Sequence, residues 1–309
     1  MTEKILVTGG AGFIGSHVVD SLIAVGCSVA VVDNLSTGRK ENLNPEAKFY
    51  RADIRDGKEI ERIFSREKPD FVNHHAAQID VRKSIEDPGF DASANIIGSI
   101  NLIDAASKTG VKKFVYISTG GAVYGEPENL PASEECPVRP ISAYGISKHT
   151  VEHYLYLYSF NYGLKYTVLR YSNVYGPGQD PLGEAGVVAI FTEKMLAEKN
   201  PVIFGTGGQT RDYVYVEDVV RANVLALSRG EGGIFNIGTG VETSVNEIFS
   251  TLSEIIGFKG SAVYDEPRKG EVERISLDNA KAVKELGWKV ENSLRDGLEK
   301  TVASYREKR

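Results

Sequence analysis

Cysteine is scarce in this 309-residue chain: only Cys27 and Cys136 are present, and their spacing matches no metal-binding pattern. We therefore expect idle thiols and no metal site. No apolar run approaches the roughly 20 residues that a membrane span needs. The N-terminus also lacks the apolar segment and cleavage site of a secretory signal. These absences predict a cytoplasmic protein with no membrane partner.

Positive charge is also in deficit. Lys and Arg total 36 against 42 for Asp and Glu, which gives a formal net charge of −6 at pH 7. A net negative charge argues against a general nucleic-acid surface, so we expect no nucleic-acid partner. An anionic ligand would need local arginines instead.

Short β-branched runs alternate with helical stretches through the first half of the chain. The expected strands are Ile5–Thr8, Val29–Asp33, Lys48–Ala52, Phe71–His75, Phe114–Ser118 and Tyr166–Tyr171. The expected helices between them are Ser16–Val25, Ile60–Arg66, Ile97–Lys108 and Ser147–Tyr162. This alternation predicts an α/β fold with a doubly wound parallel sheet of the Rossmann type.

The pattern changes after about residue 175. We expect helices at Val188–Ala197, Glu217–Ser228, Val245–Ile256 and Asn279–Leu286, and strands at Arg211–Val216 and Ile234–Ile237. The chain is therefore expected to form a nucleotide-binding domain over 1–175, to which 212–242 returns. A smaller C-terminal α+β substrate lobe would comprise 176–211 and 243–309, with the site in the cleft between them.

A glycine-rich turn joins the first strand to the first helix. Gly9 permits the tight turn, Gly12 lets the backbone approach a pyrophosphate, and Gly15 allows close helix–strand packing. Asp33 ends the second strand, where its carboxylate would bind ribose hydroxyls and repel a 2′-phosphate, which favours NAD over NADP. Asp53 ends the third strand and is a candidate for adenine recognition. The alternatives are a simple glycine turn and, for Asp53, a solvated turn residue.

Tyr144 and Lys148 lie four residues apart, so they share a helical face. A phenol has a pKa near 10, and acting as a base near pH 7 requires a lowering worth about 4 kcal/mol. A cation ~5 Å away at an effective dielectric of ~20 supplies about 3 kcal/mol. Lys148 is therefore expected to lower the phenol pKa, with an oxidised nicotinamide as a second cation. Such pairs also occur on helices by chance.

Several motifs now form a recognisable series. They are Thr8-Gly-Gly-Ala-Gly-Phe-Ile-Gly15, Val32-Asp-Asn34, Ser118-Thr-Gly-Gly-Ala-Val-Tyr-Gly125, Tyr144-Gly-Ile-Ser-Lys148, Arg170-Tyr-Ser-Asn-Val-Tyr-Gly176, Arg211-Asp-Tyr-Val-Tyr-Val216 and Asn236-Ile-Gly-Thr-Gly240. Their order resembles that of the extended short-chain dehydrogenases. The whole chain resembles the UDP-glucose 4-epimerase branch of that superfamily, down to Leu286-Gly-Trp288.

The resemblance implies a UDP-hexose 4-epimerase that interconverts UDP-galactose and UDP-glucose through a 4-keto sugar with tightly held NAD. Tyr144 would be the base, Lys148 would bind the nicotinamide ribose, and a small hydroxyl would relay the proton. The implied cofactor-binding residues are Gly9, Gly12, Phe13, Ile14, Gly15, Asp33, Asn34, Asp53, Ile54, Ala76, Ala77, Asn95, Ser118, Tyr144, Lys148 and Tyr171. Tyr171 and Asn95 would line the nicotinamide side. A homodimer built on the helices around Asn95–Lys108 and Tyr144 is also implied.

The chain departs from the family pattern at the relay hydroxyl. The family usually places serine or threonine four residues before the Tyr-Gly pair, where this chain has Gly120, followed by Gly121. We assign the role to Thr119, with Ser118 as the fallback. Related 4,6-dehydratases carry an Asp-Glu pair directly after the threonine, and two glycines cannot perform that chemistry.

Further residues are assigned to the UDP-sugar by the same resemblance. Asn173, Arg211 and Arg268 would bind the diphosphate, unless the arginines are solvated surface charges. Phe204 would contact the uracil, and Val187 would lie beside the nucleotide. Ile275 aligns with the residue that gates sugar size, which leaves a UDP-N-acetylglucosamine 4-epimerase or a dual-specificity enzyme open.

Two adjacent histidines and two other functional classes need separate treatment. We expect His74 and His75 to be packing and turn residues. A net sugar-nucleotide oxidoreductase that releases NAD(H) and a non-catalytic nucleotide sensor are the remaining alternatives. The intact Tyr144–Lys148 pair counts against the sensor.

Overall fold

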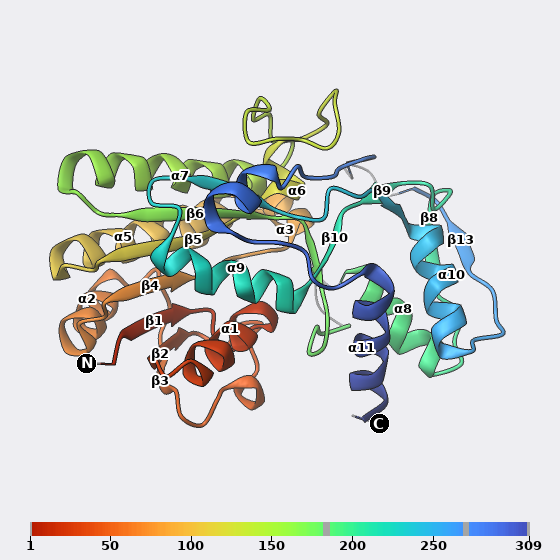
Figure 1. Cartoon of the computed structure of the whole chain (residues 1–309), viewed down its shortest axis with the longest axis horizontal. Helices are drawn as coiled ribbons and strands as arrows, with labels where there is room; N and C mark the ends of the chain where they lie inside the picture. The colour runs from red at the N-terminus through yellow and green to blue at the C-terminus, as the bar shows by residue number, and fades with distance from the viewer. Residues whose placement is uncertain (1, 182–185, 268–271, 308–309) are drawn as a thin grey trace.

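A seven-stranded parallel sheet forms the centre of the molecule in the computed structural model, which describes residues 2–181, 186–267 and 272–307 (Figure 1). Its strand order is β11-β6-β5-β4-β1-β2-β3. The strands are β1 (Lys4–Thr8), β2 (Ser28–Asp33), β3 (Lys48–Arg51), β4 (Phe71–His74), β5 (Lys113–Thr119), β6 (Tyr166–Tyr171) and β11 (Ile234–Ile237). The order reverses between β1 and β4, and ligands of open α/β sheets bind beyond the carboxyl ends of strands at such a point.

The predicted Rossmann-type sheet is confirmed, and each predicted strand of it ends within one residue of its expected position. The strands are apolar almost throughout because helices cover both faces. One face carries α2 (Gly57–Glu67), α5 (Gly98–Thr109) and α7 (Ala143–Tyr162), and the other carries α1 (Phe13–Ala24) and α9 (Val216–Ser228) (Figure 1). Shorter elements are the 3₁₀ turn η1 (Lys40–Asn42), α3 (Val81–Glu86), α4 (Pro88–Ala92), the π-helical turn η2 (Ser93–Ile97) and α6 (Gly120–Val123).

The rest of the chain builds a second layer of elements beside the sheet, at the right of Figure 1. Its helices are α8 (Val187–Leu196), α10 (Val245–Ile256) and α11 (Leu294–Glu307), whereas the π-helical turn η3 (Ala282–Leu286) packs against α9 and β11 at the main sheet. Its strand pairs are β10 (Tyr213–Tyr215) with β7 (Asn173–Tyr175), β12 (Thr243–Ser244) with β9 (Thr210–Arg211), and β13 (Val263–Asp265) with β8 (Val202–Phe204). One apolar cluster joins Leu22 of α1 to Phe191, Leu252 and Leu298 of these helices. Within the described ranges, no helix is long and apolar enough to cross a membrane.

The predicted strand Arg211–Val216 is wrong as a single element. Arg211 ends β9, β10 occupies only Tyr213–Tyr215, and Val216 already begins α9. The interruption is Asp212, which is fully buried and whose carboxylate accepts hydrogen bonds from Thr239 N at 2.8 Å and Leu277 N at 3.1 Å. These distant partners turn the Asp212 side chain inward, and the strand breaks around it.

The helix that carries Tyr144 begins earlier than the expected start at Ser147. Ser142 caps it by accepting a hydrogen bond from Gly145 N at 3.1 Å. Tyr144 N donates to Ser84 Oγ at 3.1 Å, so a side chain of α3 also satisfies the first turn. Tyr144 and Lys148 therefore both lie within α7, as the spacing required.

Candidate active site

The turn between β1 and α1 leaves a helix N-terminus open at the carboxyl edge of the sheet. Gly12 caps α1 without any side-chain hydrogen bond, so the first N–H groups of the helix have no side-chain acceptor. Gly9 has φ +69°, and a Cβ there would lie 2.7 Å from Ala76 N. A Cβ at Gly15 would lie 2.2 Å from Gly9 O. Only glycine permits this close backbone cradle, which fits the pyrophosphate of NAD.

Asp33 lies at the end of β2 beside this cradle and is fixed by the main chain. Its carboxylate accepts hydrogen bonds from Ala11 N at 3.0 Å and Leu35 N at 2.8 Å. A Cβ at Gly38 would lie 3.0 Å from both carboxylate oxygens. Each oxygen keeps a second lone pair for a ribose hydroxyl, so the fit to NAD extends from the pyrophosphate to the ribose.

Asp53 has protein partners that the sequence did not reveal. Arg55 donates to both carboxylate oxygens, at 2.9 and 2.7 Å, and Asn34 Nδ2 donates at 3.0 Å. The hydrogen bonds from Arg55 hold the pKa of the Asp53 carboxyl well below its usual range. Ile54, which lies between Asp53 and Arg55 in the sequence, packs in the core against Gly98. Adenine recognition by Asp53 and Ile54 stays a prediction.

His74 is buried at the end of β4 in a defined hydrogen-bond chain. Thr8 Oγ1 lies 2.7 Å from its Nδ1, and Ser99 Oγ lies 2.8 Å from its Nε2. Because the Ser99 hydroxyl donates its proton to Asn95 O, its oxygen must accept from His74 Nε2. Burial lowers the pKa of His74 well below its ordinary value, so the ring is neutral and structural. Burial lowers the pKa of His75 to about 3.

Tyr144 and Lys148 face the end of β5 from α7. Burial raises the pKa of the Tyr144 phenol above its ordinary value of 10, the charge of Asp91 raises it further, and a hydrogen bond with Thr119 opposes the rise. Burial lowers the pKa of Lys148 to about 7, against the charges of Asp91 and Glu152. Its Nζ lies 4.7 Å from the Tyr116 ring centroid.

The expectation that Lys148 and an oxidised nicotinamide together lower the phenol pKa stays a prediction. Burial weakens the lysine as a cation because it disfavours the ammonium, and it disfavours the phenolate of Tyr144 at the same time. At neutral pH the protein side chains alone therefore favour a protonated phenol. The shift that catalysis needs must come with the bound ligands.

Thr119 and Ser118 leave the end of β5 on opposite sides. Ser118 is buried, and its Oγ donates to Glu152 Oε1 at 2.6 Å, away from Tyr144. Thr119 hydrogen-bonds Tyr144. A Cβ at Gly121 would lie 3.8 Å from Thr119 Oγ1 and 3.7 Å from Asn173 Oδ1, so those two polar atoms face one space. These contacts place Thr119, and not Ser118, beside the base.

The two glycines after Thr119 differ in what a side chain at each position would contact. A Cβ at Gly120 would lie 2.4 Å from Leu277 Cδ1, so the Leu277 side chain fills the volume that a serine would occupy. Gly121 has only the ordinary contacts to Thr119 and Asn173 near it. The missing family hydroxyl at position 120 therefore reflects packing against Leu277.

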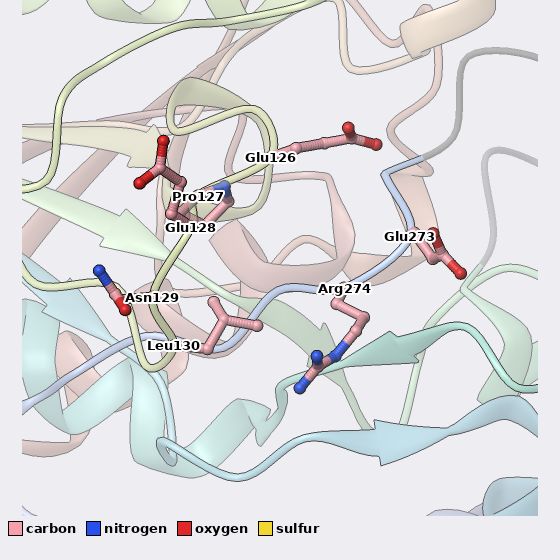
Figure 2. Close-up of a pocket in the computed structure, with 7 residues that line it drawn as sticks. All are labelled: Glu126, Pro127, Glu128, Asn129, Leu130, Glu273 and Arg274. Atoms are coloured by element: carbon pink, nitrogen blue, oxygen red, sulfur yellow. The ribbon is translucent and has the colours of Figure 1, made fainter.

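Two cavities share Glu126 and Glu273 in their walls, and neither is lined by Tyr144, Lys148 or Thr119. The larger, of about 780 Å³, is lined in part by Phe204, Gln209 and Tyr264. The smaller, of about 310 Å³, is shown in Figure 2, with Leu130 and Arg274 on neighbouring segments. Its full lining is Glu126, Pro127, Glu128, Asn129, Leu130, Glu273 and Arg274. Charge does not distinguish the two cavities as nucleotide sites, because the smaller is lined by three glutamates and Arg274 and the larger by four acidic residues. Contact of Phe204 with the uracil stays a prediction.

The family model described as "NAD dependent epimerase/dehydratase family" matches residues 5–238. The chain belongs to this family. The crystal structure of UDP-glucose 4-epimerase from Thermotoga maritima with UDP-glucose is 55% identical, with a TM-score of 0.98 and 99% of both chains covered. UDP-glucose 4-epimerase from Thermus thermophilus in complex with NAD is 46% identical, with a TM-score of 0.94, over 98% of this chain and 99% of that one.

A third member of the family differs in its sugar. UDP-N-acetylglucosamine 4-epimerase from Methanobrevibacter ruminantium, in complex with UDP-N-acetylmuramic acid, is 32% identical, with a TM-score of 0.94 and all of both chains covered. The fold, the NAD dependence and the epimerase family of this chain are therefore established. Which sugar this chain accepts depends on the residues of its own substrate site.

Other predicted residues of this family member lie as follows. Ile275 is 2% exposed and packs in an apolar cluster with Val123, Tyr124 and Leu277, behind the turn that carries Thr119. Arg211 Nη1 donates to Thr210 O at 2.8 Å. Val187 starts α8 and is half-buried, and Phe13 and Ile14 occupy the first turn of α1 beside the cradle. Ala77 directly follows the Ala76 that approaches Gly9. Arg268 lies outside the described residues.

Asn95 and Tyr171, two residues predicted to line the nicotinamide side, have protein partners for their polar atoms. Asn95 Nδ2 donates to Gln78 O, Asp91 Oδ1 and Ser147 Oγ at 3.0–3.1 Å, and its Oδ1 accepts from Gln78 N at 2.8 Å. The Tyr171 hydroxyl accepts from Asn223 Nδ2 at 2.5 Å. Both side chains are buried with their polar atoms turned toward protein partners. That they line the nicotinamide side stays a prediction.

Sequence reasoning also missed a buried ion pair beneath the site. Arg170 donates to Glu152 from Nε at 3.0 Å and from Nη2 at 2.5 Å, and both side chains are 3% exposed. Arg170 Nη1 also donates to the Tyr124 hydroxyl at 2.8 Å. Glu152 lies one helical turn beyond Lys148, a spacing that could have indicated it. The pair ties α7 to β6 and to the end of β5.

Proposed function

We propose that this chain is a UDP-hexose 4-epimerase that interconverts UDP-galactose and UDP-glucose through a transient 4-keto sugar. The observation that carries the proposal is the placement of Tyr144 and Lys148 on one helix, with Thr119 near the phenol, together with a backbone cradle that fits NAD. The 55% identity to the Thermotoga maritima UDP-glucose 4-epimerase supports it.

In the proposed mechanism, Tyr144 removes the proton from the sugar 4-hydroxyl and later returns it. Thr119 hydrogen-bonds Tyr144 and relays that proton. The bound dinucleotide supplies the hydride acceptor, and later the hydride donor, for carbon 4 of the sugar. Because burial raises the pKa of Tyr144, the phenol stays protonated until the ligands bind. Lys148, as an ammonium, stabilises the phenolate once it forms.

The substrate is proposed to bind between two lobes, 1–175 with 212–242, and 176–211 with 243–309. Asn173 Oδ1 faces the same space as Thr119, which supports contact with the sugar diphosphate. Arg211 and Arg268 are proposed to neutralise the diphosphate, and Phe204 in the larger cavity to contact the uracil. Ile275 is proposed to limit sugar size through the packing behind Thr119. Gly120 and Gly121 leave no acid–base pair for a dehydratase.

We also propose that the protein works as a homodimer in the cytoplasm. Apolar and aromatic side chains are exposed along α7 and at the end of η2, directly before α5, a pattern that supports a four-helix interface. They are Ile97, Ile146, Tyr156, Leu157, Phe160 and Tyr162. Cys27 and Cys136 are free thiols, as expected in a reducing compartment.

The test is to give the purified protein, with catalytic NAD, UDP-galactose and, separately, UDP-N-acetylgalactosamine, and to identify the sugars formed. We expect the gluco epimer without stoichiometric NADH release, and faster turnover of UDP-galactose. Stoichiometric NADH release would instead indicate a net oxidoreductase. Tyr144→Phe is the control: it should retain NAD and lose turnover by about 10²–10⁴-fold.

A further inference from the structure

Asp91 is a buried carboxylate that has no role in the mechanism above. It lies in α4, which packs against the first half of α7, and its side chain is 1% exposed. Oδ1 accepts hydrogen bonds from Gln78 Nε2 at 3.1 Å and Asn95 Nδ2 at 3.0 Å. Oδ2 is buried and makes no hydrogen bond with any described residue. Burial raises the pKa of Asp91 and the charge of Lys148 lowers it, so an ionised Asp91 and a protonated Lys148 stabilise each other.

A short hydrogen-bond path joins Asp91 to the catalytic tyrosine. Asn95 Nδ2, which donates to Asp91, also donates to Ser147 Oγ at 3.1 Å. Ser147 Oγ in turn donates to Tyr144 O at 3.0 Å. Asp91, Asn95 and Ser147 are all at most 2% exposed, so water does not compete for these bonds. The path holds the first turn of α7, and with it the Tyr144 ring, against α4.

The titratable groups that face Asp91 are Lys148 and Tyr144 from α7 and Tyr116 from β5. The charge of Asp91 raises the pKa of Lys148 against the dominant effect of burial, and after burial it is the next contribution to the raised pKa of Tyr144. Glu152 acts on Lys148 in the same direction from one helical turn further along α7, while His74 and His75 are neutral neighbours of the lysine.

We propose that Asp91 is a positioning residue of the epimerase site: its carboxylate, held by Gln78 and Asn95, is the buried counter-charge that keeps Lys148 an ammonium while it fixes the start of α7. The inference rests on the proposed function. Loss of this negative charge would favour the phenolate of Tyr144 and disfavour the ammonium of Lys148. Both groups would then titrate at lower pH.

The experiment measures kcat/KM for UDP-galactose as a function of pH in the NAD-loaded wild type and in Asp91→Asn. The substitution keeps the shape of the side chain and an acceptor for Asn95, and it removes only the charge. The acid limb reports deprotonation of Tyr144, and the alkaline limb reports loss of the Lys148 proton. We expect both limbs to move to lower pH. The matched control is Asp87→Asn, which removes an exposed carboxylate from the cap of the same helix and should leave both limbs in place.

Melting temperature and retained NAD are measured on each variant as readouts independent of turnover. Reduced activity at every pH with unmoved limbs, or a wild-type profile, overturns the proposal. If Asp91→Asn does not fold, Ser147→Ala decides, because it removes the hydroxyl that helps the Asp91 carboxyl ionise. It should shift the limbs in the same direction by less. Absence of epimerisation in the wild type would instead contradict the proposed function.

Discussion

At the scale of single residues, the site depends on two neighbours that leave one strand in opposite directions. Ser118 turns into the protein and donates to Glu152, whereas Thr119 turns toward Tyr144. A strand alternates its side chains between faces, so adjacent hydroxyls cannot serve the same reaction. We therefore propose that Thr119, and not Ser118, relays the proton to Tyr144.

Thr119→Val should therefore lower epimerisation more than Ser118→Ala. Valine keeps the shape of threonine and removes the hydroxyl, so we expect turnover to fall by about 10²-fold or more with little change in stability. Ser118→Ala should leave turnover near the wild-type level and cost about 1–2 kcal/mol in unfolding free energy, because Glu152 loses a donor. Turnover assays and urea unfolding of both variants test this. The reverse order of activities would move the relay to Ser118.

The residues that could be predicted are those whose role is set by local spacing. The glycines of the first turn and the Tyr144–Lys148 pair depend on a few consecutive residues, so their placement follows from the sequence. Asn95 and Tyr171 could not be placed, because their partners Gln78 and Asn223 come from other elements. Asp91 carried no signal at all, since its burial depends on how α4 packs on α7.

At the scale of elements, a buried ion pair fixes α7 to the sheet. Glu152 and Arg170 join it to β6 and, through Ser118, to β5. Strands of the main sheet were predictable because their apolar runs are long. The break between β9 and β10 was not, because Asp212 turns inward toward Thr239 and Leu277, which follow it by many residues.

Glu152→Gln should destabilise the protein by about 3–5 kcal/mol at pH 7, because Arg170 is left buried without a counter-charge. Burial alone would raise the pKa of Glu152, but hydrogen bonds from His149, Arg170 and Ser118 and the charge of Arg170 lower it from 4.5 to about 2. A lowered folded-state pKa gives stability that is present above about pH 4.5 and is lost as the pH falls toward about 2.

Urea unfolding of wild type and Glu152→Gln at pH 7 and at pH 3 measures both effects. The difference between them should be smaller at pH 3. Glu231→Gln is the control, because its pair with Lys165 is exposed and should contribute less than about 1 kcal/mol. An equal loss in the two variants would argue against a structural role for the buried pair.

At the scale of the whole molecule, apolar surface is distributed unevenly. The sheet and the second layer share one apolar cluster, so their contact is closed by packing. The outer face of α7, in contrast, keeps large aromatic rings in solvent, among them Phe160 at 78% exposure. A second copy of the chain bound to this face would remove these aromatic rings from solvent.

Phe160→Glu should convert the proposed homodimer to monomer without unfolding it, since the exposed side chain makes no core contact and a charge in an apolar interface is costly. Sedimentation or light scattering at several protein concentrations measures the mass. Val25→Glu is the control, because Val25 is 63% exposed at the end of α1, on the other face of the sheet, and should leave the mass unchanged (Figure 1). A monomeric wild type would contradict the dimer.

The contact between Gly120 and Leu277 constrains how this chain could change over generations. A serine at position 120 would restore the usual family hydroxyl, but its Cβ would lie 2.4 Å from Leu277 Cδ1. The two positions are therefore coupled: a serine at 120 requires Leu277, which lies in the apolar cluster with Ile275, to shift or to be replaced by a smaller residue. A change at position 120 would disturb that cluster before it could supply a hydroxyl in place of the one that we propose for Thr119.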